Sequence, residues 1–420
     1  MVAFQNMSED DEMSYFGLSG IHGRPYVAWN GVDQVEGAPS TGYCTHNEVL
    51  FAIWHRPLVA VFEQILAQHV QAVAAQYTDN ATIYRAAADA WRQPYWDWAV
   101  DKALPDAVMQ PNVTIRLPPD GHTTVTIDNP LLLYRFQQFP LNATLFPPDD
   151  EDDYHLATFP NTLRCPDPYH NFTSNEGMAS GNVGAIDLAG QVYNIYTRVF
   201  DFGGMSSTAC DSTSFEQEHN EVHVAVGGIH PMGHFAHLGY SGFDPVFMMH
   251  HAAIDRHVAL WQAIHSNASM FGPSENYQTS TGQFATAPGT SITADSPLKP
   301  FYASANGTFH TGNSARNIST FGYSYPELLT AQAAVNGIRP LHAANASRAL
   351  TMSRAVTAEI NRLYAPASSQ STTRRDVSSP AKKAYFARVG IEKAGLSLPA
   401  AVHPAHQKDV FTARSASNKL

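Results

Sequence analysis

Histidine is the residue type whose number and spacing first suggest chemistry in this chain. The sequence has 20 histidines among 420 residues, and nine of them fall between His219 and His265. Neutral imidazole is the commonest protein ligand of transition metals, so this concentration indicates a metal site. His219 and His223 are four residues apart, so on a helix both rings project from one face and can bind one ion. An isolated pair of this kind is more often a surface or core feature than a ligand pair.

Four other histidines are expected to complete two sites of three imidazoles each. His251 belongs to a second helical segment and can close the site that the first pair begins. Adjacent residues project about 100° apart on a helix, so only one of His250 and His251 is expected to face the metal. The N-terminal half supplies His22, His46 and His55, although spacing alone does not bring these three together.

The first set of histidines requires a loop as well as a helix. His46 and His55 are nine residues apart, which is half a turn out of phase on one helix. His46 must therefore lie before the helix and reach in, while His55 projects from its inner face. Three imidazoles leave a coordination position open at each ion, and all-imidazole ligation favours copper, with zinc as the alternative. Three further histidines lie among glycines and are expected in a loop: His230, His234 and His237.

Helices must position these histidines, because apolar residues recur at three- and four-residue steps in the segments that carry them. We expect long helices over about 47–70 and 244–265, and shorter ones over about 81–91, 216–226 and 347–363. Pro57 should kink the first helix or mark a join of two pieces. Two stretches rich in Pro, Gly, Asn and Asp, 104–180 and 268–318, show no sustained period. The sequence predicts a mainly α fold with a four-helix bundle core that holds a dicopper site and is wrapped by long loops.

Composition excludes two classes of partner. Charged residues make up only 15% of the chain and the formal net charge is -12, so no basic surface is expected to neutralise the phosphates of a nucleic acid. No run of eighteen apolar residues is present, so no membrane span is expected. The 44% apolar content is sufficient for a sizeable core, which predicts a globular protein.

Glycosylation motifs favour a secreted location. Chance would give roughly three Asn-X-Ser/Thr triplets in a chain of this composition. Nine are present, at Asn6, Asn80, Asn112, Asn142, Asn171, Asn267, Asn306, Asn317 and Asn345. The alternative is a Ser/Thr-rich surface with accidental triplets. The N-terminus lacks the basic start and apolar run of a secretory signal, so secretion requires a signal removed before residue 1. Three cysteines are too few for a disulfide scaffold.

Two segments around the histidines resemble the copper motifs of tyrosinases, catechol oxidases and molluscan haemocyanins. They are GYCTHNEVLFAIWHRPLVAVFEQ (42–64) and DPVFMMHHAAIDRHVALWQ (244–262). PYWDW (94–98) and NPLLLYRF (129–136) also match, in the order that the family has them, and the resemblance covers about residues 15–330. The segments SGIHGRPYVAW and GYCTHNEVLF are most similar to the short fungal catechol-oxidase and tyrosinase-like group.

The resemblance implies two copper ions and the residues that bind them. The first copper would be held by His22, His46 and His55, and the second by His219, His223 and His251. Cys44 lies two residues before His46, where many family members form a thioether bond between the cysteine and the histidine. Such a bond would fix the ring before the metal binds, and it would leave Cys165 and Cys210 to form a disulfide.

The family also suggests how a monophenol would lose its proton. Deprotonation there is attributed to an Asn directly after the first ligand of the second copper, working with a Glu and an ordered water. Asn220 occupies that position, and Glu216 is a better candidate than Glu218 for the acidic partner. The alternative is that both acidic residues are exposed at a helix start, where they would complement the helix dipole.

Four further residues are expected near the metals. Val224, directly after a ligand, would line an apolar and open entrance. Phe247 would cover the metals and restrict water, or else be ordinary core. Asp255 and Arg256 lie one turn beyond His251, where they would either hold a helix or ligand ring in place or form a structural ion pair.

The resemblance extends to the organisation of the chain. Tyr323-Ser324-Tyr325 resembles the tyrosine motif that closes the catalytic core in this family. We expect a catalytic domain over 1–365, a linker over 366–383 and a partial C-terminal tail over 384–420. Likeness to the family's β-rich covering domain begins near Tyr385 and fades after Val402.

The function implied by this resemblance is that of a copper-dependent polyphenol oxidase. Such an enzyme, a catechol oxidase or tyrosinase, oxidises o-diphenols to o-quinones while O₂ is reduced to water, and monophenols or o-aminophenols are further candidate substrates. One alternative is a haemocyanin-like oxygen carrier that uses the same dicopper site. A carrier unit keeps its covering β domain, of which this chain has at most a fragment. A second alternative is a zinc-binding structural or hydrolytic protein.

Overall fold

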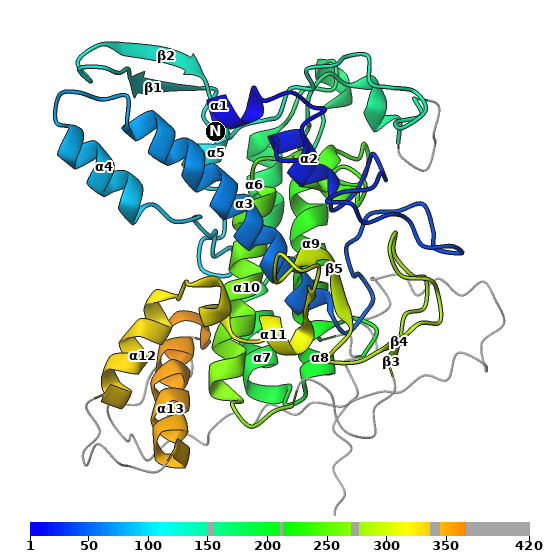
Figure 1. Cartoon of the computed structure of the whole chain (residues 1–420), viewed down its shortest axis with the longest axis vertical. Coiled ribbons are helices and arrows are strands. Elements are labelled where there is room, and N and C mark those ends of the chain that lie inside the picture. The colour runs from blue at the N-terminus through cyan, green and yellow to red at the C-terminus, as the bar shows by residue number, and fades with distance from the viewer. Residues whose placement is uncertain (149–153, 211–212, 270–276, 337–344, 367–420) are drawn as a thin grey trace, which may run out of the picture. The chain divides into compact units, whose positions relative to one another are not determined.

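A computed structural model describes residues 1–148, 154–210, 213–269, 277–336 and 345–366 (Figure 1). A division of the chain falls between Gln370 and Ser371, so all described residues belong to the first unit, Met1–Gln370. The expected linker beyond residue 366 and the expected tail over 384–420 lie outside the described residues. The division of the chain into a catalytic domain, linker and tail therefore stays a prediction.

Four helices form the centre of the first unit, which confirms the mainly α prediction. The helix α3 packs along α10, α6 packs along α9, and α9 contacts both α10 and α3 (Figure 1). Their bounds are Phe51–Ala74 for α3, Glu176–Gly184 for α6, Phe215–Gly227 for α9 and Phe247–Ile264 for α10. Apolar residues at three- and four-residue steps turn inward along α3, where Ile53, Trp54, Leu58 and Phe62 are buried.

The helix α3 differs from its prediction at two points. It begins at Phe51 rather than near Asn47, and Asn47 has a φ of 51°, a left-handed conformation that lies outside a right-handed helix. It also continues through Pro57 as one helix of 24 residues. The predicted join of two helical pieces at Pro57 was therefore wrong.

The two other histidine-bearing helices have identifiable ends. Helix α9 begins after Ser214, whose side chain accepts a hydrogen bond from the Gln217 amide, and ends at Gly228, where φ is 84°. Helix α10 begins three residues later than expected because Asp244, with a ψ of 128°, is extended. A residue that precedes a proline, as Asp244 does, disfavours the helical conformation.

Shorter helices surround this centre. Helices α4 and α13 confirm the predictions over 81–91 and 347–363. Several of the other short helices carry no long apolar period. The α-helices are α1 (Val2–Gln5), α2 (Tyr15–Gly20), α4 (Ala81–Ala90), α5 (Asp106–Met109), α7 (Leu188–Arg198), α8 (Phe202–Ser206), α11 (Gly312–Ala315), α12 (Pro326–Asn336) and α13 (Asn345–Tyr364). The 3-10 helices are η1 (Leu156–Thr158), η2 (Pro168–His170), η3 (His234–Ala236), η4 (Ser241–Phe243) and η5 (Ile318–Phe321).

Small antiparallel hairpins lie within the stretches that were expected to be loops. They pair β1 (Asn112–Arg116) with β2 (Thr124–Asp128), β3 (Tyr277–Gln278) with β4 (Ser291–Ile292), and β5 (Pro297–Tyr302) with β6 (Phe309–Thr311). In β1 and β2 the burial alternates between exposed and half-buried residues, so this hairpin has no fully buried face to produce a strong sequence signal. Among the described helices, none is long and apolar enough to cross a membrane.

Candidate metal centre

The first set of histidines is gathered by three different elements. His22 follows α2, His46 lies in the loop before α3, and His55 lies on α3. One nitrogen from each of the three rings lies within 4.8 Å of the others. The arrangement that the nine-residue spacing required, with His46 before the helix and His55 on its inner face, is confirmed.

The outer nitrogen of each of these rings has a partner, and the inner nitrogen has none. His55 Nδ1 donates to the Phe51 carbonyl at 2.8 Å, His46 Nδ1 lies 3.2 Å from Cys44 Sγ, and His22 Nδ1 lies 3.5 Å from Ser241 Oγ. The Nε2 atoms of all three rings are buried without a hydrogen-bond partner. A proton held on Nδ1 leaves the Nε2 lone pair for a metal, which is the usual arrangement of ligating histidines.

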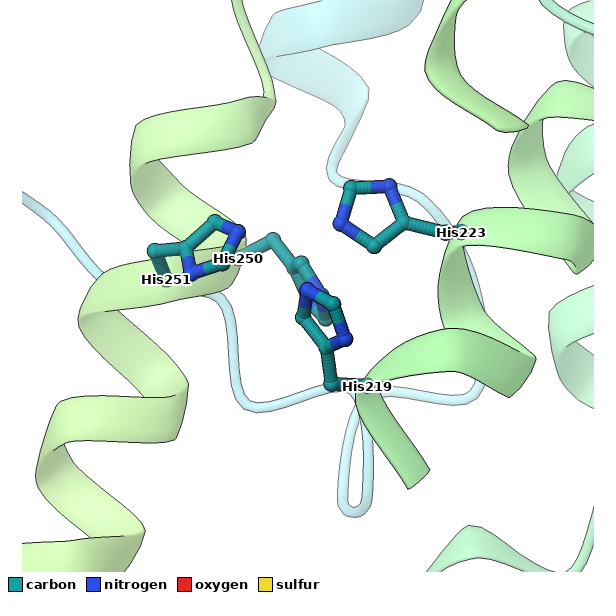
Figure 2. Close-up of side chains that lie close together, drawn as sticks. All are labelled: His219, His223, His250 and His251. Carbon is teal, nitrogen blue, oxygen red and sulfur yellow. The ribbon is translucent and has the colours of Figure 1, made fainter. Parts of the chain in front are cut away.

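The second set lies between α9 and α10. His219 and His223 project from one face of α9, and His250 and His251 project toward them from α10 (Figure 2). One nitrogen from each of these four rings lies within 4.8 Å of the others. His223 Nδ1 donates to the Phe235 carbonyl at 2.6 Å, and the Nε2 atoms of His219 and His223 are again buried without a partner.

The expectation that helical spacing keeps one of the adjacent pair away from the cluster is not met, because a nitrogen of each ring lies within 4.8 Å of the His219 and His223 nitrogens, and the choice of His251 as the ligand stays a prediction. The His250 ring lies 5.0 Å from the His219 ring and 4.8 Å from the His223 ring, so both neighbours reach the cluster. At the start of α10, two side chains that point about 100° apart can therefore both contact the His219 and His223 rings of α9.

The two sets of histidines face one another, and His251 lies where they meet. Its ring stacks on His55 with 4.3 Å between centroids, and it lies 5.8 Å from His22. His250 instead contacts the rings of Trp98 and Phe235, away from the first set. This position between the two sets favours His251 as the sixth ligand.

The protonation state of these rings suits metal binding. Burial lowers the pKa of His55 to about 3 and of His223 to about 4. Burial, followed by the proximity of the other imidazoles, places the pKa of His22, His46, His219 and His251 well below the usual value. Neutral imidazoles with buried and unpartnered nitrogens are costly unless a cation binds them. The donor set therefore fits two imidazole-bound transition-metal ions.

Comparison with known proteins identifies the family. The pattern described as the common central domain of tyrosinase matches residues 12–264. A tyrosinase of Podospora anserina is 34% identical over 350 residues, which are 77% of this chain and 57% of that relative. The chain belongs to the tyrosinase family. Proteins of this family bind two copper ions, and the two histidine clusters are the groups in this chain that could hold them.

Other relatives and a solved structure agree. Polyphenol oxidase 2 of Agaricus bisporus is 31% identical over 328 residues, 77% of this chain and 56% of that relative. A mushroom tyrosinase, solved in a crystal that contains latent and active forms, superposes with a TM-score of 0.75 at 29% identity, covering 87% of this chain and 90% of that one. Hemocyanin 2 of Megathura crenulata is 27% identical over 275 residues, 64% of this chain. The chain spans a little over half the length of the tyrosinase and polyphenol oxidase described here.

The cysteines of this tyrosinase-family chain are placed unequally. Cys44 is buried between two histidines of the first set, with its thiol donating to the His22 carbonyl at 3.1 Å while its sulfur contacts the His46 ring. This contact is compatible with a thioether, which stays a prediction. The expected disulfide between Cys165 and Cys210 is not formed. Cys165 Sγ instead contacts the Ala225 and Val226 carbonyls at the end of α9.

The two acidic residues at the start of α9 are buried, so the alternative of an exposed acidic helix start was wrong. Glu216 Oε1 accepts a hydrogen bond from the Asn47 amide at 2.6 Å, and Oε2 accepts from the Ser207 hydroxyl and from the amide and hydroxyl of Thr208. Burial raises the pKa of Glu216, and burial with the charge of Glu221 raises the pKa of Glu218 to about 8.

The other expected helpers also adjoin the ligands. Asn220 Oδ1 accepts a hydrogen bond from His219 Nδ1 at 3.0 Å, so this residue contacts the second set directly. Val224 is 39% exposed and lines a cavity beside α9. Phe247 is buried, and its ring lies 4.7 Å from His22 and 4.2 Å from His251. The roles of these residues in catalysis stay predictions.

Asp255 and Arg256 do not pair with one another. Asp255 binds Arg56 at 2.5 Å and accepts the hydroxyl protons of Tyr323 and Tyr325. The tyrosine motif thus attaches to α10 next to the metal centre, which the resemblance anticipated only in outline. Sequence reasoning overlooked Arg56, although its place directly after His55 inside an apolar helix was a signal for a buried partner.

Arg256 belongs to a separate network on the other side of α10. It binds Asp97 at 3.0 Å, Glu327 at 2.5 Å and the Tyr364 hydroxyl at 2.8 Å. These contacts connect α10 to the segment after α4, to α12 and to α13. The expectation that Arg256 holds helices together fits these contacts.

Proposed function

We propose that this chain is a copper-dependent phenol oxidase that converts o-diphenols to o-quinones while O₂ is reduced to water. The observation that carries the proposal is the meeting of two sets of three imidazoles, all with a buried and unpartnered Nε2 atom, at the His55–His251 contact, 4.3 Å between ring centroids. The names of the relatives, tyrosinase and polyphenol oxidase, support it. In a balanced reaction, two diphenols give four electrons and four protons to one O₂, which yields two quinones and two waters.

The six histidines would hold one copper in each set, and the bound metals would supply the electron transfer between diphenol and O₂. The chain's own contribution is positioning. Backbone carbonyls of Phe51 and Phe235 fix the tautomer and direction of His55 and His223. Phe247 packs against rings from both sets and keeps water from that side of the centre.

Monophenol oxidation needs a proton acceptor, and Asn220 and Glu216 are our candidates for holding the water that takes this proton. Asn220 is placed by its hydrogen bond to His219. Glu216 is held by donors from Asn47, Ser207 and Thr208, which stabilise its ionised form against burial. We extend the proposal to monophenols and o-aminophenols on this basis.

Secretion and glycosylation form a second part of the proposal. All sequon asparagines whose side chains the structure describes are exposed: Asn6, Asn80, Asn112, Asn142, Asn171, Asn267, Asn306 and Asn317. An exposed Asn is a requirement for attachment of a glycan to a folded surface. Treatment of the secreted protein with an N-glycosidase should lower its mass, and an unchanged mass would exclude N-glycans.

Copper loading followed by a catechol assay tests the function. The loaded chain should contain two coppers and consume O₂ in the presence of 4-methylcatechol. His55→Ala removes a ligand of the first copper and should leave one copper per chain and no oxidation, whereas the exposed His122→Ala should change neither. Two bound coppers with reversible O₂ binding and no quinone would favour an oxygen carrier. Zinc binding without copper binding would refute the proposal.

A further inference from the structure

A cavity of about 600 Å³ lies beside α9, where it is lined by the residues that directly follow His219 and His223 in the chain. The face of α9 that carries Gln217, Glu221 and Val224 forms one wall, and Asn182 of α6 and Ile229 of the turn after α9 form others. Val224 and Ile229 are exposed large apolar side chains, at 39% and 48%. The cavity therefore combines an apolar surface that suits an aromatic ring with a few polar groups.

Two pairs of consecutive residues on α9, His219–Asn220 and His223–Val224, connect the cavity with the metal centre. His219 and His223 turn toward the metals, while the residues that follow them, Asn220 and Val224, line the cavity. Adjacent residues on a helix point about 100° apart, so the cavity and the metal centre are neighbouring sides of the same helix. The hydrogen bond of 3.0 Å between His219 and Asn220 joins the two sides directly.

Among the described residues that line this cavity, Glu221 is the one that carries a charge. Gln217 Nε2 donates to its Oε1 at 3.2 Å and Gln191 Nε2 donates to its Oε2 at 3.1 Å. Both donors are neutral amides, and across the described part of the chain no cation pairs with this carboxylate. The two amides fix the position of the carboxylate and leave its negative charge uncompensated.

We propose that the cavity selects phenolic substrates that carry a cationic amine on their side chain, with Glu221 as the counter-ion and Val224 and Ile229 as the apolar contact. The proposal rests on the phenol oxidase function proposed above. A half-buried carboxylate without a cation attracts an ammonium group and repels a second carboxylate. Substrates with an acidic side chain should accordingly be disfavoured against neutral ones.

The test compares three catechols that differ in charge on the copper-loaded full chain: dopamine, neutral 4-methylcatechol and anionic 3,4-dihydroxyphenylacetate. Glu221→Gln should lower kcat/KM for dopamine about fivefold to tenfold. It should leave kcat/KM for 4-methylcatechol within about twofold and raise kcat/KM for the anionic catechol. Glu221→Lys should invert the preference. The exposed Glu36→Gln makes the same change in net charge away from the cavity and should leave the ratios unchanged.

The outcomes separate this proposal from the proposed function. An unchanged dopamine to 4-methylcatechol ratio in Glu221→Gln, or an equal change in Glu36→Gln, would overturn the role of Glu221. If the wild-type chain oxidises no catechol, the proposed function fails. The role of the cavity is then tested by comparing the affinities of the chain for 2-phenylethylamine and for 3-phenylpropionate. Tighter binding of the amine that is lost in Glu221→Gln supports the cavity, and equal binding of both probes overturns it. Added salt should weaken the discrimination.

Discussion

The guanidinium of Arg56 and the carboxylate of Asp255 form a buried ion pair, with 2.5 Å between Nε and Oδ1, that joins α3 to α10 beside the metal centre. Arg56 directly follows His55, and Asp255 lies one turn after His251. The same guanidinium donates to the Ala315 and Arg316 carbonyls, and the same carboxylate accepts from Tyr323 and Tyr325. The pair thus fixes the helices that bring His55 and His251 into contact.

Asp255→Asn should strongly destabilise the fold. It leaves the Arg56 charge buried without compensation, which costs about 3–5 kcal/mol when one partner of a buried pair is removed. Urea denaturation of the metal-free chain measures the free energy of unfolding. Glu359→Gln removes one partner of the exposed pair with Arg362 and should leave that free energy nearly unchanged. A loss below about 1 kcal/mol in Asp255→Asn would contradict the importance of the buried pair.

The adjacent histidines of α10 should respond differently to substitution. His251→Ala removes the ring that contacts both histidine sets, so we expect the chain to bind one copper instead of two. His250→Phe keeps a ring packed against Trp98 and His219 and should still bind two coppers. Metal content by mass spectrometry decides, with circular dichroism as the check on folding. If His250→Phe lost a copper and His251→Ala did not, His250 would be the ligand in place of His251.

The sequence predicted the helices whose apolar spacing is long and uninterrupted, and it failed where distant segments decide the structure. α3, α9 and α10 carry clear three- and four-residue periods. By contrast α2, which places His22, has six residues and depends on a Ser14 cap and on packing against η4. A helix this short gives no period that could be recognised.

The site was predictable residue by residue only where ligands share an element or a recognised motif. The four-residue spacing of His219 and His223 indicates a pair by itself. The burial of Glu216 was not predictable from α9, because its donor Asn47 lies 169 residues away in the chain. The position of His250 also depends on how α10 faces α9, which no spacing within α10 specifies.

Buried His234 should make the stability of the chain depend on pH. Burial lowers the pKa of His234 from 6.5 to about 3. In the unfolded chain His234 takes up a proton below about pH 6.5, while the folded chain keeps it neutral. The contribution of neutral His234 to the free energy of unfolding is therefore fully present above pH 6.5 and is lost as pH falls toward 3. The loss is about 1.4 kcal/mol for each pH unit in that window.

His234→Gln should therefore reduce the pH dependence of unfolding by about that slope between pH 6 and 4.5. Denaturation of the metal-free chain avoids any contribution from copper release. The other buried histidines contribute equally to both proteins and cancel in the difference. Phe159→Leu alters a ring that packs 6.3 Å from His234 and should shift stability equally at every pH. Parallel pH curves for wild type and His234→Gln would show that His234 does not cause the effect.

Asn220→Ala should lower monophenol oxidation more than diphenol oxidation. The substitution removes the acceptor 3.0 Å from His219 Nδ1 and one of the two groups proposed to hold the proton-accepting water. A diphenol needs no hydroxylation step, so its oxidation should fall only through the looser His219 ring, by a few-fold, whereas loss of proton-transfer assistance costs about a hundredfold or more. Tyramine and dopamine form a matched pair because they differ by one hydroxyl and carry the same ammonium group toward Glu221. Asn220→Asp keeps an acceptor for His219 and should retain more monophenol activity than Asn220→Ala. Equal losses on tyramine and dopamine in Asn220→Ala would reduce Asn220 to a residue that only positions His219.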